Sequence, residues 1–221
     1  DGEHRPVMLA EVLSVFEPLD GATVVDCTLG YGGHATELLQ RVGPTGRLVG
    51  FDLDASNLPD VQEHLSTIGH PFSLHHSNFA AIPTILGEQS IDGADAILAD
   101  LGMSSMQVDD AERGFSYSRE GALDMRMDRT RGRTAADILH TIGKEELMRV
   151  LHELGDEPEP ELVANAILQA RESGRIETTK GLARVIMDAT KQANWRLHPT
   201  PGKWNLHPAA RTFQALRILV N

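Results

Sequence analysis

The sequence predicts an α/β fold built on a parallel sheet, followed by a lobe made of helices. Two observations predict the sheet. Short apolar runs alternate with helical patterns through the first hundred residues, and three of these runs end on an aspartate, namely Asp26, Asp52 and Asp100. Near-continuous apolar strands separated by helices are typical of a parallel sheet that is covered on both faces.

Four strands and three helices are expected in this first part. The strands are expected at residues 23–27, 47–52, 72–76 and 94–100, and the helices at residues 8–19, 33–42 and 58–68. In the first of these helices the apolar residues recur at helical spacing and share one face, as Leu9, Val12, Leu13 and Phe16 do.

The pattern changes after Asp100. Residues 101–133 are rich in Gly, Asp, Arg, Ser and Met and show no sustained period, and a loop of this length is usually functional or disordered. Helices are expected at 134–142, 144–154, 159–173, 178–193 and from about residue 209, with Thr178 and Thr179 as candidate N-caps. We therefore predict a sheet domain at 1–103, an inserted loop and helical lobe at 104–206, and a return to the sheet domain at 207–221.

The composition limits the class of protein. The 221 residues carry a formal net charge of −12, which argues against coating nucleic acid through bulk charge but leaves room for a local basic patch. No apolar run approaches the roughly 20 residues that a membrane span needs, and no secretion signal opens the chain. The single cysteine, Cys27, excludes an internal disulfide and fits a reducing compartment, so we expect a cytoplasmic protein. We expect no metal site, because His75 and His76 point to opposite faces of a strand and no further ligands stand at suitable spacing.

A glycine-rich loop follows the first strand, at residues 26–34, and it predicts a nucleotide-type cofactor. Asp52 ends the second strand 22 positions after Gly30, where an α/β nucleotide site places the acid that binds ribose hydroxyls. The loop does not supply the G-x-G-x-x-G pattern of a dinucleotide site. Asp26 would repel a pyrophosphate but suits S-adenosylmethionine, which carries a sulfonium and an amino group. The loop thus favours a methyltransferase, while another nucleotide binder and a purely structural turn remain alternatives.

Asp100 ends the fourth strand and is expected to border the same cleft as Asp52, because ligands of open α/β sheets lie beyond the carboxyl ends of the strands. An exocyclic aromatic amine is a poor nucleophile, and a carboxylate that accepts its N–H bonds stabilises the charge that develops during methyl transfer. Asp100 is therefore a candidate catalytic residue. The alternatives are a loop cap or a ligand of the cofactor's amino group.

Six segments carry a resemblance to a known family, and the resemblance extends over nearly the whole chain. They are residues 4–9, 26–34, 100–107, 109–116, 123–128 and 207–218. With these segments the chain resembles the ribosomal RNA small-subunit methyltransferase H family (RsmH, also called MraW). The glycine loop alone has little specificity, whereas the segments after Asp100 are highly specific.

The resemblance implies a Rossmann-like class I methyltransferase sheet with an inserted helical lobe. It implies S-adenosylmethionine as cofactor and methylation of N4 of a cytidine in 16S rRNA of the small ribosomal subunit. The cofactor contacts carried over residue by residue are Gly32, Gly33, His34, Asp52, Phe79, Asp100 and Gln107. The family continues past this chain with a further strand, so we expect the sheet to lack its C-terminal strands.

For the residues that could bind the substrate, the sequence leaves alternatives. Arg126, Arg129, Arg131 and Arg133 form the densest positive cluster, which either contacts phosphates or pairs with neighbours such as Asp124 and Asp128. Four aromatic residues either stack on an unpaired base or pack internally, namely Phe115, Tyr117, Trp195 and Trp204. Two other functions remain alternatives, a non-catalytic ribosome-assembly or RNA-binding factor and a nicotinamide-dependent dehydrogenase. A homodimer is also left open.

Overall fold

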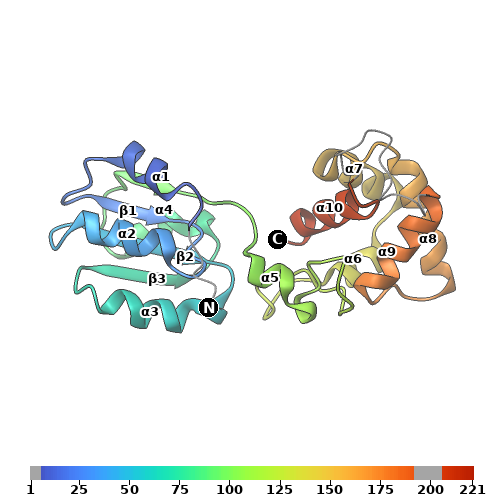
Figure 1. Ribbon diagram of the computed structural model, residues 1–221, viewed down its shortest axis with the longest axis horizontal. Helices are drawn as coiled ribbons and strands as arrows, with labels where there is room; N and C mark the ends of the chain where they lie inside the picture. The colour runs from blue at the N-terminus through green and yellow to red at the C-terminus, as the bar shows by residue number, and fades with distance from the viewer. Residues whose placement is uncertain (1–5, 192–205) are drawn as a thin grey trace, which may run out of the picture. The chain divides into compact units, whose positions relative to one another are not determined.

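The computed structural model describes residues 6–191 and 206–221, and the chain divides into two compact units, Asp1–Gly102 and Met103–Asn221 (Figure 1). We call them unit 1 and unit 2. They divide one residue before the expected boundary at residue 103. The assignment of separate functions to them stays a prediction.

Unit 1 is built on a four-stranded parallel sheet. Its strands are β1 (Thr23–Asp26), β2 (Arg47–Asp52), β3 (Phe72–His76) and β4 (Ala96–Leu98), in the order β3-β2-β1-β4. Val25 of β1 pairs in register with Val49 of β2 on one side and with Ile97 of β4 on the other. This is the order of the first four strands of a Rossmann-type sheet. The predicted α/β class with a parallel sheet is confirmed.

Helices cover unit 1 on both faces of the sheet, because successive strand residues point to opposite sides. Val24 and Leu48 pack in one cluster with α1 (Leu9–Phe16), α2 (Gly33–Val42) and α3 (Leu58–Ser66). Val25 and Val49 pack in another cluster with Leu86 of α4 (Ile82–Glu88). Two short 3₁₀ turns, Ala55–Asn57 and Phe79–Ala81, precede α3 and α4. The sequence did not predict α4, because this helix has only seven residues and contains both Pro83 and Gly87. A proline in the first turn is nevertheless compatible with a helix.

Unit 2 is helical. Its helices are α5 (Ser105–Asp109), α6 (Ala135–Thr141), α7 (Lys144–Gly155), α8 (Pro160–Ser173), α9 (Thr179–Thr190) and α10 (Ala210–Val220), with a 3₁₀ turn at Ala111–Arg113. The predicted lobe is therefore present. Thr178 caps α9, as expected, by accepting a hydrogen bond from the Gly181 N–H (3.0 Å). Thr179 is instead fully buried and donates its hydroxyl to the Arg119 carbonyl (2.5 Å).

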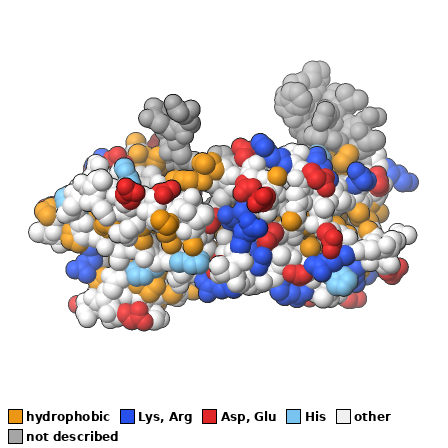
Figure 2. All heavy atoms as spheres, turned by 90° about the horizontal axis from the view of Figure 1, so that it is seen from below, with side chains coloured by type: hydrophobic (Ala, Val, Ile, Leu, Met, Phe, Trp, Pro, Cys, Tyr) orange, Lys and Arg blue, Asp and Glu red, His pale blue; other side chains and the backbone are white. Residues whose placement is uncertain are grey.

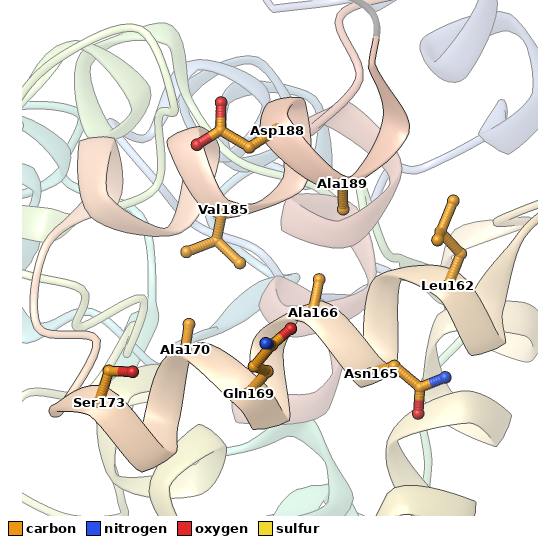
Figure 3. Close-up of a pocket in the computed structure, with 9 residues that line it drawn as sticks. All are labelled: Leu162, Asn165, Ala166, Gln169, Ala170, Ser173, Val185, Asp188 and Ala189. Atoms are coloured by element: carbon orange, nitrogen blue, oxygen red, sulfur yellow. The ribbon is translucent and has the colours of Figure 1, made fainter.

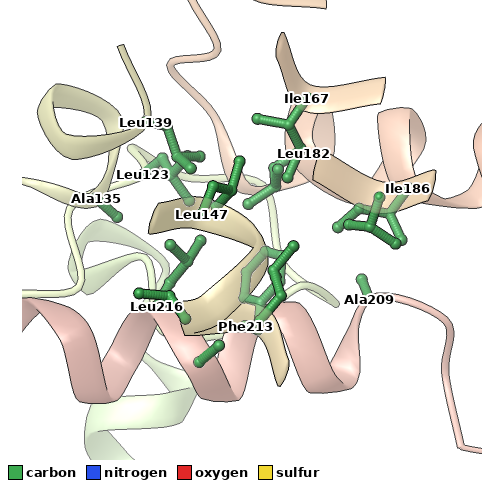
Figure 4. Packing of buried hydrophobic residues seen from close by; sticks show 14 of the residues in the cluster. Leu123, Ala135, Leu139, Leu147, Ile167, Leu182, Ile186, Ala209, Phe213 and Leu216 are labelled. Carbon is green, nitrogen blue, oxygen red and sulfur yellow. The ribbon is translucent and has the colours of Figure 1, made fainter. Parts of the chain in front are cut away.

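The core of unit 2 is formed by apolar side chains from α6 to α10 and from the loop before them. Leu147, Leu182, Phe213 and Leu216 are fully buried and meet in one cluster (Figure 4). α10 packs mainly on α7. The sequence assigned residues 207–221 to a return to the sheet domain, but the structure places α10 in unit 2, because the apolar face of α10 completes this helical core.

The long segment before α6, residues 110–133, is ordered through packing rather than regular structure. Phe115, Leu123 and Met125 are buried, and backbone hydrogen bonds join Leu123 N–H to the Glu177 carbonyl (2.8 Å) and Met125 N–H to the Arg113 carbonyl (3.0 Å). The absence of a hydrophobic period thus reflects a packed loop. Within the two described stretches of chain, no helix is long and apolar enough to cross a membrane.

Candidate functional site

The turn between β1 and α2 depends on glycine. Gly30 and Gly32 both have positive φ angles, of 52° and 77°, a conformation that residues with a Cβ rarely adopt. A Cβ on Gly32 would lie 2.9 Å from Val61 Cγ1 of α3. Gly32 is the N-cap of α2 and offers no side chain to the helix, so the first-turn amides of α2 are left for another partner. This is a cradle of N–H groups that a polar ligand can approach.

Asp52, at the end of β2, holds this turn in place. Its Oδ2 accepts a hydrogen bond from the Gly30 N–H (2.6 Å), and its Oδ1 accepts one from the Asp54 N–H (2.8 Å). Burial raises the pKa of Asp52, although these two hydrogen bonds oppose the shift. The acid is thus fixed in orientation beside the glycine turn, and its ribose-binding role stays a prediction.

Asp26, at the end of β1, is the least compensated charge in unit 1. Its side chain is 1% exposed, and its Oδ1 accepts a hydrogen bond from the Thr28 N–H (3.0 Å). Its Oδ2 has no hydrogen-bond partner among the described residues. Burial is the main cause that raises the pKa of Asp26 to about 6, while His34 lowers it and Asp52 and Asp100 raise it further. A cationic ligand beside Asp26 would relieve this cost of burial.

His34 and Gly33 begin α2 and contact the segment before α1. His34 is buried, and its Nε2 lies 3.0 Å from the Val7 carbonyl oxygen. Because a carbonyl oxygen can only accept a hydrogen bond, Nε2 carries the hydrogen that is donated. A Cβ on Gly33 would lie 2.6 Å from Pro6 Cγ. Both residues therefore hold the N-terminal segment against α2. Any contact of theirs with a cofactor would come through backbone amides.

Asp100 is exposed and follows β4. Its backbone N–H donates to Thr28 Oγ1 (2.8 Å), so the segment that carries Asp100 is tied to the glycine turn. Thr28 is a positioning residue that sequence reasoning missed. The available signal was a hydroxyl two residues past the acid that ends β1.

Phe79 lies after β3 and is 41% exposed. The carboxyl ends of parallel strands meet at one edge of a sheet. The structure therefore brings Asp26, Asp52, Asp100 and Phe79 to the same edge of unit 1. Gln107 belongs to unit 2, where its side chain accepts a hydrogen bond from the Ser104 N–H (3.1 Å) in the capping box of α5. Its grouping with the cofactor residues stays a prediction.

The arginine cluster of unit 2 is largely paired internally. Arg126 makes two hydrogen bonds to the Asp124 carboxylate (2.7 and 2.9 Å), and Arg131 pairs with Asp128. Arg133 donates to Thr141 Oγ1 (2.5 Å) and to the Asp137 carbonyl. Acidic and basic side chains are interspersed on the face of the molecule seen in Figure 2. Of the two interpretations left open, the structure supports internal pairing for most of this cluster.

The candidate stacking residues of unit 2 are packed as well. Phe115 is fully buried, and the ring of Tyr117 stacks on His207 with centroids 4.3 Å apart. Trp195 and Trp204 lie outside the described residues. Cys27 is buried, and burial raises the pKa of its thiol. Within residues 6–191 and 206–221, no three His, Cys, Asp or Glu side chains gather in a way that could hold a metal ion.

Comparisons with known proteins show the family of this chain. The profile of the MraW methylase family matches residues 1–221. Ribosomal RNA small subunit methyltransferase H of Geobacter sp. (strain M21) is 44% identical over 221 residues, which are 100% of this chain and 69% of that protein. The protein of the same name from Geobacter sulfurreducens is 42% identical over 218 residues, 99% of this chain and 68% of that protein.

Two solved structures match part of the chain. A crystal structure of a putative rRNA-methylase from Clostridium thermocellum matches with a TM-score of 0.37 and 23% identity, covering 44% of this chain and 55% of that one. A SAM dependent methyltransferase from Aquifex aeolicus matches with a TM-score of 0.29 and 24% identity, covering 32% and 38%. The family assignment depends instead on the sequence matches, which extend along the whole of this chain. On these matches, the resemblance inferred from the sequence is confirmed, and the chain belongs to the MraW methylase family.

Proposed function

We propose that this chain is an S-adenosylmethionine-dependent methyltransferase that modifies the N4 amino group of a cytidine in 16S rRNA. The observation that carries the proposal is the acidic edge of unit 1. Asp26, Asp52 and Asp100 follow three neighbouring strands, and none of them forms an ion pair with Lys or Arg within the described part of the chain. An edge of this kind suits a cofactor that carries positive charge and hydroxyl groups.

The residues present fit S-adenosylmethionine. The unpartnered Oδ2 of buried Asp26 suits a cationic group, Asp52 suits ribose hydroxyls, and the first-turn amides at Gly33 and His34 suit a carboxylate. When bound, the cofactor supplies an electrophilic methyl group. Phe79 offers an exposed ring at the same edge, and Gln107 joins these residues in the proposal through the family resemblance.

Asp100 is the proposed catalytic residue. Its exposed carboxylate can accept an N–H bond of the target amine, which orients the nitrogen lone pair and stabilises the positive charge that grows on it. The hydrogen bond from its backbone to Thr28 keeps it registered with the glycine turn. Transfer needs no covalent enzyme intermediate, because the amine is itself the nucleophile.

The names of the relatives point to rRNA of the small subunit as substrate. A protein acting on ribosomal subunits would work in the cytoplasm. A homodimer stays a prediction, which sedimentation of the purified chain would test.

The decisive experiment is methyl transfer from labelled S-adenosylmethionine to small ribosomal subunits that lack the modification, followed by nucleoside analysis. N4-methylcytidine as the labelled product would establish cofactor, substrate and target atom together. Label in another nucleoside would overturn the assignment of the target. No label would overturn the proposal for this chain.

Two substitutions test the residue roles. Asp52→Ala should weaken cofactor binding by about 10- to 100-fold, the range expected for hydrogen bonds to a charged group. Asp100→Ala should lower turnover by about 100-fold or more. Asp92→Ala, which removes an exposed acid from the loop before β4, is the matched control and should change neither quantity.

A further inference from the structure

Charge is divided unevenly along the chain. Residues 1–177 contain 13 of the 20 Lys and Arg residues and 31 of the 32 Asp and Glu residues. Residues 178–221 contain the other seven cations and a single acid, Asp188. A net charge of −12 for the whole chain therefore conceals a C-terminal part that is strongly basic. An asymmetry of this kind indicates an anionic partner for the basic part.

The structure shows which of these seven cations are engaged within the protein. Arg217 donates to the Phe115 carbonyl (2.9 Å), and Arg211 donates to the Asp156 carbonyl. Arg196 and Lys203 lie outside the described residues. The other three are Lys180, Arg184 and Lys191, and no ion pair or hydrogen bond involves their side chains within the described part of the chain.

These three residues lie on or directly after α9. Lys180 and Arg184 are four positions apart and share one side of α9 with Asp188, which is four positions after Arg184, and Lys191 is the C-cap directly after the helix. Arg184 and Lys191 are exposed and Lys180 is half-buried. Leu182 and Ile186 of the same helix are fully buried in the core of unit 2. We call Lys180, Arg184 and Lys191 the α9 cations.

Helix stability does not explain all three of the α9 cations. Lys191 lies at the C-terminus of α9, where the helix dipole favours a cation, but Lys180 lies in the first turn, where the dipole disfavours one. The first turn of α9 holds no acid that would offset it. A partner outside the helix would account for the cation at this position.

A groove beside α9 is a poorer candidate for an anion. It lies between α8 and α9, has a volume of about 520 Å³ and is lined by small and polar side chains such as Asn165, Gln169 and Ser173 (Figure 3). The one charged residue in its lining is Asp188. The groove therefore offers no cation to an anionic strand, whereas the neighbouring part of α9 and its C-cap carry three cations against this one acid.

We propose that the α9 cations form a contact surface for the phosphate backbone of RNA. The proposal deepens the proposed function, since it assigns part of the substrate contact to residues outside the acidic edge. RNA fits better than an anionic membrane, because α9 contributes no exposed large hydrophobic residue among those described, and a helix that lies on a membrane needs an apolar face.

The test compares three forms of the chain. The test variant is K180Q/R184Q/K191Q, and the matched control is R41Q/K144Q/R149Q, which removes three cations that pair with Glu17, Glu161 and Glu153. Affinity for small-subunit rRNA is measured between 50 and 400 mM KCl. We expect the slope of log affinity against log salt to become shallower by about 2 to 3 in the test variant, at about 0.7 to 0.9 per lost phosphate contact, and to stay near wild type in the control.

Further readouts separate contact from structure. Cofactor affinity and the maximal rate at saturating rRNA should not change in the test variant, while KM for rRNA should rise at least about tenfold. The charge-conserving variant K180R/R184K/K191R should restore the wild-type slope. An unchanged slope in K180Q/R184Q/K191Q would overturn the proposal, as would a loss confined to binding of vesicles that contain phosphatidylserine.

The same data distinguish this inference from the proposed function. If the wild-type chain transfers methyl groups but the test variant matches the control, the inference fails and the function stands. If the wild-type chain transfers none but its salt-dependent RNA binding is lost in the test variant, the function fails and the surface stands.

Discussion

The two units bury aspartates in opposite ways. In unit 1, Asp26 is 1% exposed and has an oxygen with no partner among the described residues, and burial raises its pKa to about 6. In unit 2, Asp124 is 7% exposed but receives two hydrogen bonds from Arg126, which together with other contacts lower its pKa. A buried acid that is already paired stabilises its own unit, whereas an unpaired one costs stability and leaves its charge for a ligand.

Helix caps and the burial of apolar side chains vary from element to element within each unit, since α7, α8 and α10 of unit 2 also begin without a side-chain cap. Thr134 and Thr178 cap α6 and α9 through their side chains, while α2 of unit 1 begins at Gly32 without such a cap. Phe213 of unit 2 is fully buried, while Ile97 of β4 is 53% exposed on the sheet. In unit 1 an oxygen of Asp26 lacks a hydrogen-bond partner at the edge where the cofactor is proposed to bind, and among the described residues of unit 2 the buried Thr212 hydroxyl lacks one as well.

The largest expected effect tests the closed core of unit 2. Phe213→Ala should lower the free energy of unfolding by about 3 to 5 kcal/mol, because it leaves a cavity among fully buried side chains. Ile97→Ala in unit 1 should cost less than about 1 kcal/mol, since the side chain is 53% exposed. Urea unfolding of both variants measures the contrast, and equal losses would contradict it.

Asp26→Asn should stabilise unit 1. The folded pKa of about 6 exceeds the ordinary 3.8, so ionised Asp26 costs stability above pH 6, and this cost disappears as the pH falls towards 4. The difference of about 2 pKa units corresponds to about 3 kcal/mol at pH 8. Urea unfolding at pH 4.5, 6 and 8 should show a gain that grows with pH, together with weaker cofactor binding. A gain that is the same at all three values would exclude the titration of Asp26 as its cause.

Asp124→Asn should have the opposite effect on unit 2. It removes charge-assisted hydrogen bonds to Arg126 and should lower the free energy of unfolding by about 2 kcal/mol at pH 7. Because the folded pKa of Asp124 lies below 3.8, the stability it contributes is present above that pH and is lost as the pH falls below it. Asp109→Asn, which breaks the exposed pair with Arg119, is the control and should cost less than about 0.5 kcal/mol.

The smallest effect concerns the caps. Thr134→Ala and Thr178→Ala should each cost about 1 kcal/mol, because each leaves a first-turn amide without its hydroxyl acceptor. Thr84→Ala, at an exposed position within α4, should leave thermal unfolding nearly unchanged. If Thr84→Ala lowered the stability as much as Thr134→Ala does, the loss in Thr134→Ala could not be attributed to the helix cap.

Much of the fold could be predicted from the sequence because its signals are local. The apolar runs of β2 and β3 and the helical period of α2 gave these elements at their observed limits, 47–52, 72–76 and 33–42. The place of α10 could not be predicted in this way. Its apolar face is equally compatible with a sheet and with a helical core, and only the packing against α7 decides between them.

In the candidate site, too, local features could be predicted from the sequence and features that depend on tertiary contacts could not. The loop glycines and the three acids at strand ends are visible in the sequence, because turn chemistry and strand boundaries are local. The pairing of Arg126 with Asp124 was only one of two readings, and the unpaired state of Asp26 could not be foreseen, since partners come from the whole fold. The role of Thr28 depends on β4 lying beside β1, which a single sequence does not specify.

The hydrogen bond between Thr28 and Asp100 has a kinetic consequence. It ties the glycine turn to the segment after β4, so a shift of one also moves the other. Asp52 holds the same turn by accepting a hydrogen bond from the Gly30 N–H, so a ligand that strengthens this hydrogen bond also restrains the backbone of Asp100. For the proposed reaction, this coupling predicts ordered binding, with the small cofactor first and the large substrate second, which would then meet an acid already in place.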